Sequence, residues 1–358
     1  MKNRIDKVIE KMKEKNVYQI IVTSKASLYY LTGILIESGE RMIAFYINTD
    51  GEKKLIINKL FSLPKHMDIE TIWYTDSDDP VSYLNDIVKE NEVLGIDKFW
   101  PSCFLLHLME FNKVKKFINS SDIIDEMRMV KDEKERELMR KSSKINDTVM
   151  EKFFNELKEG ISEKACAKIL QDLYETEGAS GESFSSIVAF GVNAADPHHM
   201  CDDTKLEYGD NIIIDIGGIY NNYCSDMTRT VFYKKEPDFE KKKIYEIVKE
   251  ANLKAISKVK EGVTFSDIDK EARSYIEQKG YGKFFTHRTG HSVGIEIHDK
   301  GDVSSSNNDT VKEGMIFSIE PGIYIPNEYG VRIEDLVMVK KDGVEVLNGV
   351  SKELKVIE

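Results

Sequence analysis

Two acidic residues in the C-terminal half of the chain follow apolar runs that are typical of buried strands. Asp215 comes directly after three isoleucines, and Glu320 comes directly after a run that begins at Met315. Burying a carboxylate without a partner costs several kcal/mol, so each of these acids requires a cation or a proton nearby. A second acid follows each of them, Asp226 after 11 residues and Glu334 after 14 residues. We therefore expect a site whose chemistry depends on carboxylates.

The residues between the two acids of each pair predict β-hairpins. Asn221-Asn222 lies within the first pair, and the segment 326–330, which reads Pro-Asn-Glu-Tyr-Gly, lies within the second. Turn-forming residues between two apolar runs are typical of hairpins, whose arms bring their side chains close together. Two such hairpins related by a pseudo-twofold axis would bring four carboxylates to one point.

Four carboxylates in one buried site cannot all remain ionised unless cations neutralise them. We expect two divalent metal ions, with one acid from each pair bridging both. Oxygen ligands favour Mn²⁺, and a single imidazole also permits Co²⁺, Zn²⁺ or Fe²⁺. His291 is the candidate imidazole, because small residues surround it in Thr289-Gly290-His291-Ser292-Val293-Gly294.

Each candidate ligand also has a purely structural interpretation. Asp215 could end a strand, and Asp226 could accept hydrogen bonds from the backbone beside it. Glu334 could pair with Arg332, which lies on the same strand face two residues earlier. His291 could be a hydrogen-bonded core histidine. The ordered set of five within a repeat favours the metal site over these separate explanations.

An internal repeat must position the two acidic pairs. Lys158-Glu159-Gly160-Ile161-Ser162 reappears 102 residues later as Lys260-Glu261-Gly262-Val263-Thr264. Segment 209–217 resembles segment 314–322, which lies 105 residues later, and both copies lead to a tyrosine, Tyr220 and Tyr324. Two copies of helix, helix and strand pair predict an α+β domain with pseudo-twofold symmetry.

The same repeat predicts where its helices begin and end. Ser162 and Thr264 are the expected N-caps of two helices, and Gly178 and Gly280 are the glycines expected just beyond their ends. A long helix from about residue 131 to residue 157 should precede the first copy. Its predicted buried stripe consists of Leu138, Ile145, Val149, Phe153 and Leu157.

The length of 358 residues predicts two domains. Residues 1–125 alternate between predicted helices and strands and should form a small α/β domain, and residues 126–358 carry both acidic pairs. In the first domain we expect a helix near the N-terminus and further helices at 80–89 and 102–111. Strands are expected at 18–22, 42–47, 55–57, 69–74 and 93–96.

Composition argues against several classes of partner. The chain has 63 acidic and 51 basic residues and a formal net charge of −12, which disfavours nucleic acids and anionic lipid surfaces. No apolar run approaches the roughly 20 residues needed to cross a bilayer, and the N-terminus shows no signal-peptide core. Four cysteines occur without CxxC pairing. We expect a cytoplasmic protein with no nucleic-acid or membrane partner.

At these motifs the chain resembles the pita-bread metallopeptidase family, specifically its Xaa-Pro branch of aminopeptidase P and prolidase. The matching stretches are Asp215-Ile216-Gly217-Gly218, Ser225-Asp226-Met227-Thr228-Arg229-Thr230, Gly290-His291-Ser292-Val293-Gly294-Ile295-Glu296-Ile297-His298, Ile319-Glu320-Pro321-Gly322-Ile323-Tyr324 and Val331-Arg332-Ile333-Glu334-Asp335. The resemblance implies a pita-bread catalytic domain. It also implies a smaller creatinase-like N-terminal domain, for which Tyr30-Leu31-Thr32-Gly33 is the local match. Ser292 stands where the family often has glycine.

The resemblance also implies roles for individual residues. Asp215 would bind one metal ion, Asp226 and Glu334 would bridge both, and His291 with Glu320 would bind the other. Two histidines that bind no metal would contact the substrate, and they map to His198 and His298. His199 is the alternative to His198, and Arg332 and Tyr220 are further candidates to contact substrate or to support the ligands.

The resemblance implies hydrolysis of the peptide bond before a proline in a di- or oligopeptide. It also implies a homodimer, because members of the family are commonly dimers. Glu320 is the candidate for relaying a proton from the attacking water to the leaving nitrogen. Two other hypotheses remain at this point. One is a metal-independent C–N hydrolase of the creatinase type, and the other is a non-catalytic binding module with the pita-bread shape.

Overall fold

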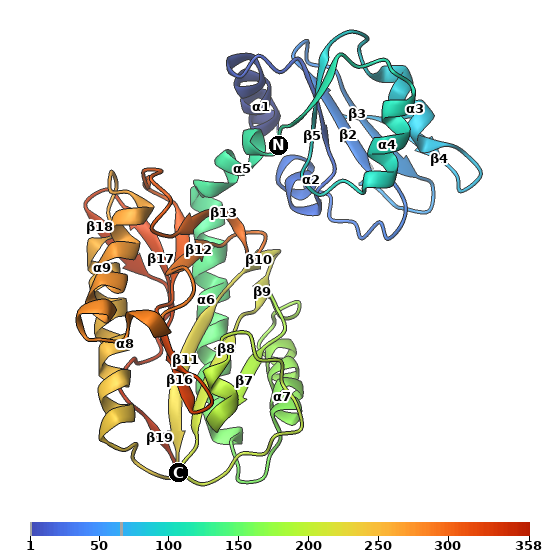
Figure 1. Ribbon diagram of the computed structural model, residues 1–358. Helices are drawn as coiled ribbons and strands as arrows, with labels where there is room; N and C mark the ends of the chain where they lie inside the picture. Colours follow the sequence, from blue (N-terminus) through green and yellow to red (C-terminus); the bar gives the residue numbers. More distant parts are fainter. Residues whose placement is uncertain (1, 65–66) are drawn as a thin grey trace. The chain divides into compact units, whose positions relative to one another are not determined.

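The computed structural model describes residues 2–64 and 67–358. They divide between Arg128 and Met129 into two compact units (Figure 1). Each unit has its own sheets and its own apolar core. Among the described residues, no helix is both long enough and apolar enough to span a membrane.

The first unit contains a six-stranded mixed sheet with the order β4-β3-β2-β1-β5-β6. Val81 and Leu84 of one helix and Leu108 of another pack against the sheet residues Tyr46 and Leu94. Its helices are α1 (Lys2–Glu14), α2 (Lys25–Thr32), α3 (Pro80–Ile87), α4 (Ser102–Glu110) and α5 (Asp122–Met129). Its strands are β1 (Gln19–Val22), β2 (Ala44–Asn48), β3 (Lys53–Asn58), β4 (Glu70–Tyr74), β5 (Val93–Ile96) and β6 (Lys116–Asn119). The predicted α/β character is confirmed, and the sequence analysis missed α2, α5 and β6.

The second unit contains two larger sheets that repeat one plan, besides two two-stranded hairpins. The first has the order β19-β11-β8-β7 and the second has the order β13-β12-β14-β17-β18. The strands of the first sheet are β7 (Ile187–Phe190), β8 (Asn211–Ile216), β11 (Met227–Tyr233) and β19 (Val356–Ile357). Those of the second are β12 (Gly290–Ser292), β13 (Asp299–Val303), β14 (Ile316–Ile319), β17 (Asp335–Lys340) and β18 (Gly343–Val346). The central pairs β8–β11 and β14–β17 are both antiparallel, which confirms the pseudo-twofold α+β architecture.

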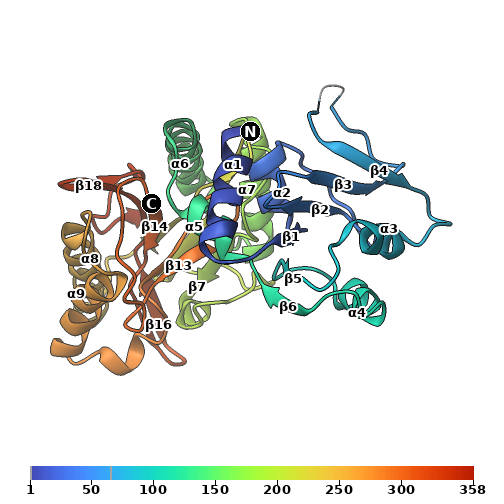
Figure 2. The ribbon, with the colours of Figure 1, turned by 90° about the horizontal axis from the view of Figure 1, so that it is seen from above.

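Each sheet has its own pair of covering helices. The helices are α6 (Glu133–Phe153), α7 (Glu163–Thr176), α8 (Phe239–Lys258) and α9 (Phe265–Gln278). Side chains of α6 and α7 share an apolar cluster with the first sheet, and those of α8 and α9 share another with the second. Figures 1 and 2 show the strands between the green helices α6 and α7 and the orange helices α8 and α9.

The repeat appears in local hydrogen bonds as well as in topology. Ser162 caps α7 by accepting from the amide of Ala165 at 3.2 Å, and Thr264 caps α9 by accepting from the amide of Asp267 at 3.1 Å. Gly178 and Gly280 have φ values of 83° and 88°, the left-handed region that glycine enters without a steric penalty. The predicted caps and helix ends are therefore confirmed.

The buried face of α6 differs from the predicted stripe. Val149 and Phe153 are buried, but Leu138 and Ile145 are only half-buried. Polar residues occupy part of the buried face instead. Ser142 Oγ donates to the carbonyl of Gly218 or Tyr223 at 3.1 and 3.0 Å, and Asn146 Nδ2 donates to the carbonyl of Ile216 at 3.0 Å. The helix is turned so that these side chains satisfy backbone carbonyls beside the hairpin.

Both predicted hairpins are present at the ends of the central strands. One pairs β9 (Ile219–Tyr220) with β10 (Tyr223–Cys224), and the other pairs β15 (Gly322–Ile325) with β16 (Tyr329–Arg332). The turn residues Asn221, Asn222 and Asn327 have φ values of 46°, 68° and 61°, which asparagine tolerates better than most residues. Each hairpin leads the chain back to the second acid of a pair, which directly precedes the next long strand, Asp226 before β11 and Glu334 before β17.

Candidate metal centre and active site

The five predicted ligands line one cavity of about 530 Å³ in the second unit. Asp215 lies on β8 and Asp226 directly precedes β11, which is paired with β8. Glu320 directly follows β14, Glu334 directly precedes β17, and His291 lies on β12 beside β14. The repeat thus brings together side chains that are as far as 119 residues apart in the sequence.

Asp215 is held by a guanidinium group from the other half of the repeat. Arg332 Nη2 donates to Asp215 Oδ2 at 2.6 Å, and Arg332 Nη1 donates to the hydroxyl of Tyr324 at 2.9 Å. Arg332 Nε donates to Thr228 Oγ1 at 3.1 Å. The structural interpretation of Glu334 suggested that it pairs with Arg332. In the structure Arg332 pairs with Asp215 instead. The charged group of Arg332 fixes one carboxylate oxygen of Asp215 and leaves the other without a hydrogen-bond partner among the described residues.

The remaining ligands are positioned by short-range contacts. His291 Nε2 lies 3.4 Å from Glu320 Oε1 and 3.6 Å from Asp226 Oδ2. Ser318 Oγ donates to Glu320 Oε1 at 3.0 Å, and Thr228 Oγ1 donates to Glu334 Oε2 at 2.8 Å. Hydroxyl groups thus orient two carboxylates without neutralising them.

Burial and mutual repulsion dominate the electrostatics of the site. Burial, reinforced by the charges of Asp215 and Glu320, raises the pKa of Asp226 well above its ordinary value. Burial, reinforced by Asp226 and then Glu320, raises the pKa of Glu334 in the same direction. Burial lowers the pKa of His291 to about 4, so its imidazole is neutral at pH 7, which is the form that binds metals.

Three carboxylate oxygens of the predicted ligands show whether this site suits metal ions. Asp215 Oδ1, Asp226 Oδ1 and Glu334 Oε1 are buried and have no hydrogen-bond partner among the described residues. Ligand atoms of Asp226, Glu334 and His291 all lie within 4.8 Å of one another. Buried acceptors without donors are costly, and divalent cations would satisfy them. The donor set therefore fits metal ions with oxygen and imidazole ligands.

The structure places the other predicted site residues differently. His198 and His298 both line the cavity, and the His298 ring lies 4.3 Å from the His291 ring, centroid to centroid. His199 does not line it and instead places Nε2 2.6 Å from Glu163 Oε2. Tyr220 is also absent from the lining, and its ring lies 4.7 Å from Lys141 Nζ.

Two polar lining residues were missed by the sequence analysis, His287 and Arg288. His287 Nε2 lies 3.0 Å from the hydroxyl of Tyr324, and burial lowers the pKa of His287. Arg288 forms an ion pair with Asp302 at the cavity, and its side chain is 36% exposed. Their position in the sequence, just before Thr289-Gly290-His291, could have indicated them, because residues next to a metal ligand in the chain often lie at the same cavity.

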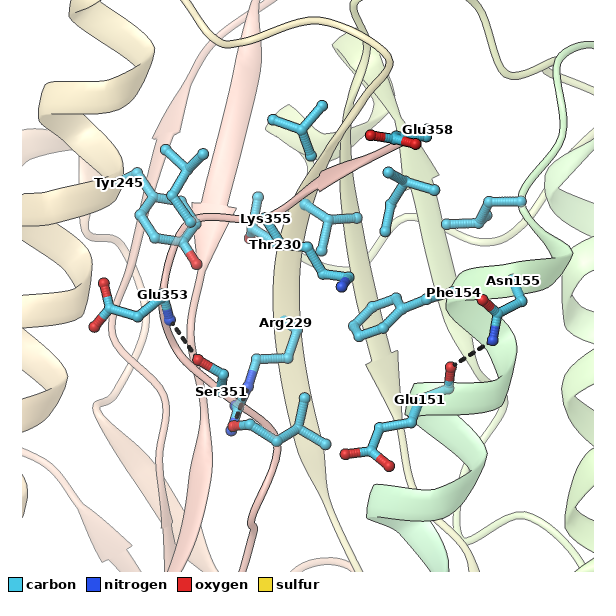
Figure 3. Close-up of a pocket in the computed structure, with 16 residues that line it drawn as sticks. Glu151, Phe154, Asn155, Arg229, Thr230, Tyr245, Ser351, Glu353, Lys355 and Glu358 are labelled. Atoms are coloured by element: carbon cyan, nitrogen blue, oxygen red, sulfur yellow. Dashed lines mark hydrogen bonds between the residues drawn. The ribbon is translucent and has the colours of Figure 1, made fainter.

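A larger cavity, of about 810 Å³, lies elsewhere in the second unit. Figure 3 shows Phe154 and Asn155 at the end of α6 on one side and Tyr245 of α8 on the other, with Arg229 between them. Its lining contains none of the five predicted ligands. Arg229 there donates to the carbonyl of Val350 and to Asp335. Size alone does not identify the active site in this protein.

Comparison with known proteins agrees with this geometry. Residues 137–341 match the metallopeptidase family M24, and residues 4–130 match the creatinase/prolidase N-terminal domain. An uncharacterized peptidase of Staphylococcus aureus (strain bovine RF122 / ET3-1) is 35% identical over 98% of this chain and 99% of its own length.

Solved structures give the same result. A recombinant prolidase from Thermococcus sibiricus has a TM-score of 0.93 and 36% identity, covering 99% of this chain and 98% of the other. An X-Pro aminopeptidase from Thermotoga maritima has a TM-score of 0.83 and 30% identity, covering 97% of this chain and 100% of the other. A two-domain fold with a candidate metal centre between repeated halves of one domain defines the class as metallopeptidase. The chain belongs to metallopeptidase family M24.

Proposed function

We propose that this metallopeptidase hydrolyses the peptide bond between an N-terminal residue and a proline, with two divalent metal ions bound in the cavity of the second unit. The observation that carries the proposal is the convergence of three buried, unpaired carboxylate oxygens from Asp215, Asp226 and Glu334. The names of the prolidase and the X-Pro aminopeptidase support proline as the residue after the cleaved bond.

The five ligands would divide between the two ions. Asp215 would hold one ion, His291 and Glu320 the other, and Asp226 and Glu334 both. When bound, such ions lower the pKa of a water molecule and polarise a carbonyl group. Mn²⁺ is the first candidate because four of the five ligands are carboxylates, and the single imidazole also suits Co²⁺, Zn²⁺ or Fe²⁺.

The chain's own side chains would move the proton. Glu320 keeps a carboxylate oxygen within 3.0 Å of Ser318 Oγ and 3.4 Å of His291 Nε2, so its orientation is fixed at the cavity. From there it would take the proton of the attacking water and pass it to the leaving nitrogen. The proline nitrogen belongs to a tertiary amide and needs this proton in order to leave.

The histidines would contact the substrate in the neutral form. Burial lowers the pKa of His298 to about 4, and its neighbours His291 and Arg288 act in the same direction. At pH 7 the ring therefore carries one N–H that can donate to the substrate. His198 lines the same cavity and would also contact the substrate. Phe184, Ile187 and Ile297 add apolar lining that suits a pyrrolidine ring.

The test is hydrolysis of Ala-Pro and Ala-Pro-Ala after metal removal and reloading with Mn²⁺, Co²⁺ or Zn²⁺. We expect cleavage before proline, no comparable cleavage of Ala-Ala, and two ions per chain at full activity. Equal rates on Ala-Ala would contradict the proline preference. A rate unaffected by exhaustive chelation would contradict the metal dependence and favour a creatinase-type hydrolase. The ratio of rates on Ala-Pro and Ala-Pro-Ala decides between dipeptidase and aminopeptidase.

A further inference from the structure

A buried carboxylate outside the metal centre has four hydrogen-bonding partners. Glu163, the first residue of α7, is 0% exposed. Its Oε1 accepts from the amide of Phe190 at 2.8 Å and from Asn193 Nδ2 at 3.0 Å. Its Oε2 lies 2.6 Å from His199 Nε2 and accepts from the amide of Asp202 at 3.1 Å. All four partners lie on one segment, residues 190–202.

The cluster of Glu163, His199 and Asp202 has the composition of a cation site, but its geometry argues against one. A carboxylate offers about four acceptor positions, and Glu163 already has four partners. Asp202 Oδ1 accepts from the amide of Thr204 at 2.7 Å. The cluster therefore holds a segment of the chain in place and leaves no carboxylate oxygen of Glu163 for a metal ion.

That segment carries His198 into the active-site cavity. His198 is exposed, and its ring makes no hydrogen bond to another described residue. On one side of it, Pro197 accepts a hydrogen bond through its carbonyl from Arg332 Nη1 at 3.3 Å. On the other side, His199 is paired with Glu163. Two anchors thus flank an imidazole that has none of its own.

The second half of the repeat holds its histidine by different means. His298 directly precedes β13, which pairs with β12, so backbone hydrogen bonds of a sheet fix it. Between Phe190 and Asn211 the described chain forms no strand. In the first half, the side chain of Glu163 replaces the missing strand pairing.

The position equivalent to Glu163 shows that the repeat itself does not need a carboxylate there. Phe265 is the first residue of α9, 102 residues after Glu163, and its ring lies 5.3 Å from that of Phe317, centroid to centroid. The backbone contact is the same in both halves. The amide of Glu163 donates to the carbonyl of Thr204 at 3.1 Å, and the amide of Phe265 donates to that of Asp309 at 3.1 Å. An apolar side chain fills this place in one half.

We propose that Glu163 and His199 are positioning residues that hold the imidazole of His198 at the substrate. They fix the backbone of segment 190–202, and this inference rests on the proposed function, in which His198 contacts the peptide. His199 thereby has a role distinct from that of its neighbour, although the two histidines are adjacent in the sequence.

A double-mutant cycle tests the proposal on the metal-loaded full chain with Ala-Pro as substrate. His199→Leu removes the donor to Glu163, and we expect kcat to fall roughly 10- to 100-fold, as for a hydrogen-bond donor displaced by about 1 Å, with KM changed less than about threefold. His199→Gln retains an N–H near the position of Nε2 and should restore most of kcat. In a His198→Ala background, His199→Leu should change kcat less than about twofold, because coupled residues are not additive.

Hydrogen exchange supplies a readout that is independent of activity. In His199→Leu and in Glu163→Gln, the amide of Asp202 should exchange faster than in the wild type, while amides of β14 should not. Asp203→Asn is the matched control. Asp203 lies in the neighbouring turn and is exposed, and its carboxylate contacts Lys164 Nζ at 3.0 Å. It should leave both kcat and exchange unchanged.

The outcomes separate this inference from the proposed function. A wild type that does not cleave Xaa-Pro bonds refutes the proposed function, and the exchange data still report whether Glu163 holds the segment. A wild type that is active, with a His199→Leu effect that is equally large in the His198→Ala background, would overturn the positioning role. So would unchanged kcat and exchange in His199→Leu.

Discussion

The two halves of the catalytic unit share a strand plan but carry different chemistry. Phe190 pairs with Ile212 in the first half and Ser292 pairs with Phe317 in the second, so the strands correspond with offsets of 102 and 105 residues. By this register, His291 occupies the position of Ala189, and Glu320 that of Asp215. One half supplies an imidazole where the other has a methyl group.

The second acids of the two pairs are not at equivalent positions. Asp215 is opposite Thr228, and Ile319 is opposite Asp335, which makes Thr228 the equivalent of Glu334 and Asp226 the equivalent of Arg332. At these two positions the first half has the carboxylate of Asp226 and the hydroxyl of Thr228. The second half has the guanidinium of Arg332 and the carboxylate of Glu334. A symmetric scaffold produces two unlike environments at one centre, and these would give each of the two proposed cations a different set of ligands.

The largest effect on kcat should come from Glu320, although Asp215 occupies the equivalent position in the other half. Glu320→Gln should lower kcat roughly 10³- to 10⁴-fold, because the proton relay is lost. Asp215→Asn should weaken the binding of one ion, so excess Mn²⁺ should recover much of its activity. Rates measured against metal concentration check this. Glu328→Gln, in the exposed turn of the second hairpin, is the control, and Mn²⁺ rescue of Glu320→Gln would contradict the assignment.

Arg332 tests the cross-half pairing. Arg332→Gln should lower kcat/KM roughly 100-fold, because it leaves Asp215 without its charged partner. The kcat/KM of Arg332→Lys should lie between that of Arg332→Gln and that of the wild type, since a lysine ammonium cannot reproduce the fork that reaches both Asp215 and Tyr324. Steady-state kinetics with a melting curve for each variant decides it. Equal activity of the lysine variant and the wild type would show that charge alone suffices.

Both cationic side chains that line the cavity come from the second half, and Arg288 is the exposed one. Arg288 is predicted to bind the C-terminal carboxylate of a dipeptide substrate. Arg288→Gln should then raise KM for Ala-Pro about tenfold, as expected for the loss of one charge-assisted hydrogen bond. Ala-Pro-amide, which lacks that carboxylate, should show no change. Asp302→Asn, which frees Arg288 from its ion pair, should not weaken dipeptide binding. An equal KM increase for both substrates would refute this role.

The smallest effect concerns an ion pair that joins the halves at the surface. Arg140 of α6 binds Glu345 of β18 at 2.6 and 3.0 Å, and this hydrogen bonding lowers the pKa of Glu345 from 4.5 to about 2. Its stabilisation is therefore fully present above pH 4.5 and is lost as the pH falls through about 2. Since both side chains are about one-third exposed, Glu345→Gln should cost about 1 kcal/mol or less at pH 7.

Urea unfolding at several pH values measures this difference. The wild type and Glu345→Gln should converge in stability as the pH approaches 2. Glu353→Gln, which alters an exposed partner of Lys249, should show a smaller difference at pH 7. A gap between the wild type and Glu345→Gln that is independent of pH would contradict the ion pair as its cause.

Local motifs made much of the fold predictable, and tertiary contacts account for the rest. Ser162, Thr264 and the glycines after their helices were predictable because capping depends on a few adjacent residues. The face of α6 was not, because Ser142 and Asn146 are buried to satisfy carbonyls about 70 to 80 residues away in the chain, which hydrophobic periodicity does not register. Arg332 was a candidate from its motif, but its choice of Asp215 over Glu334 depends on how the two sheets meet.

The five predicted ligands are divided between two continuous parts of the chain. The exposed connection at residues 234–236 separates Asp215 and Asp226 from the other three predicted ligands. A chain cut there would yield two fragments, neither of which could assemble the full ligand set. Uptake of metal by the mixture would then report that the fragments had reassociated, so this enzyme could serve as the basis of a split-protein sensor whose signal is a bound ion.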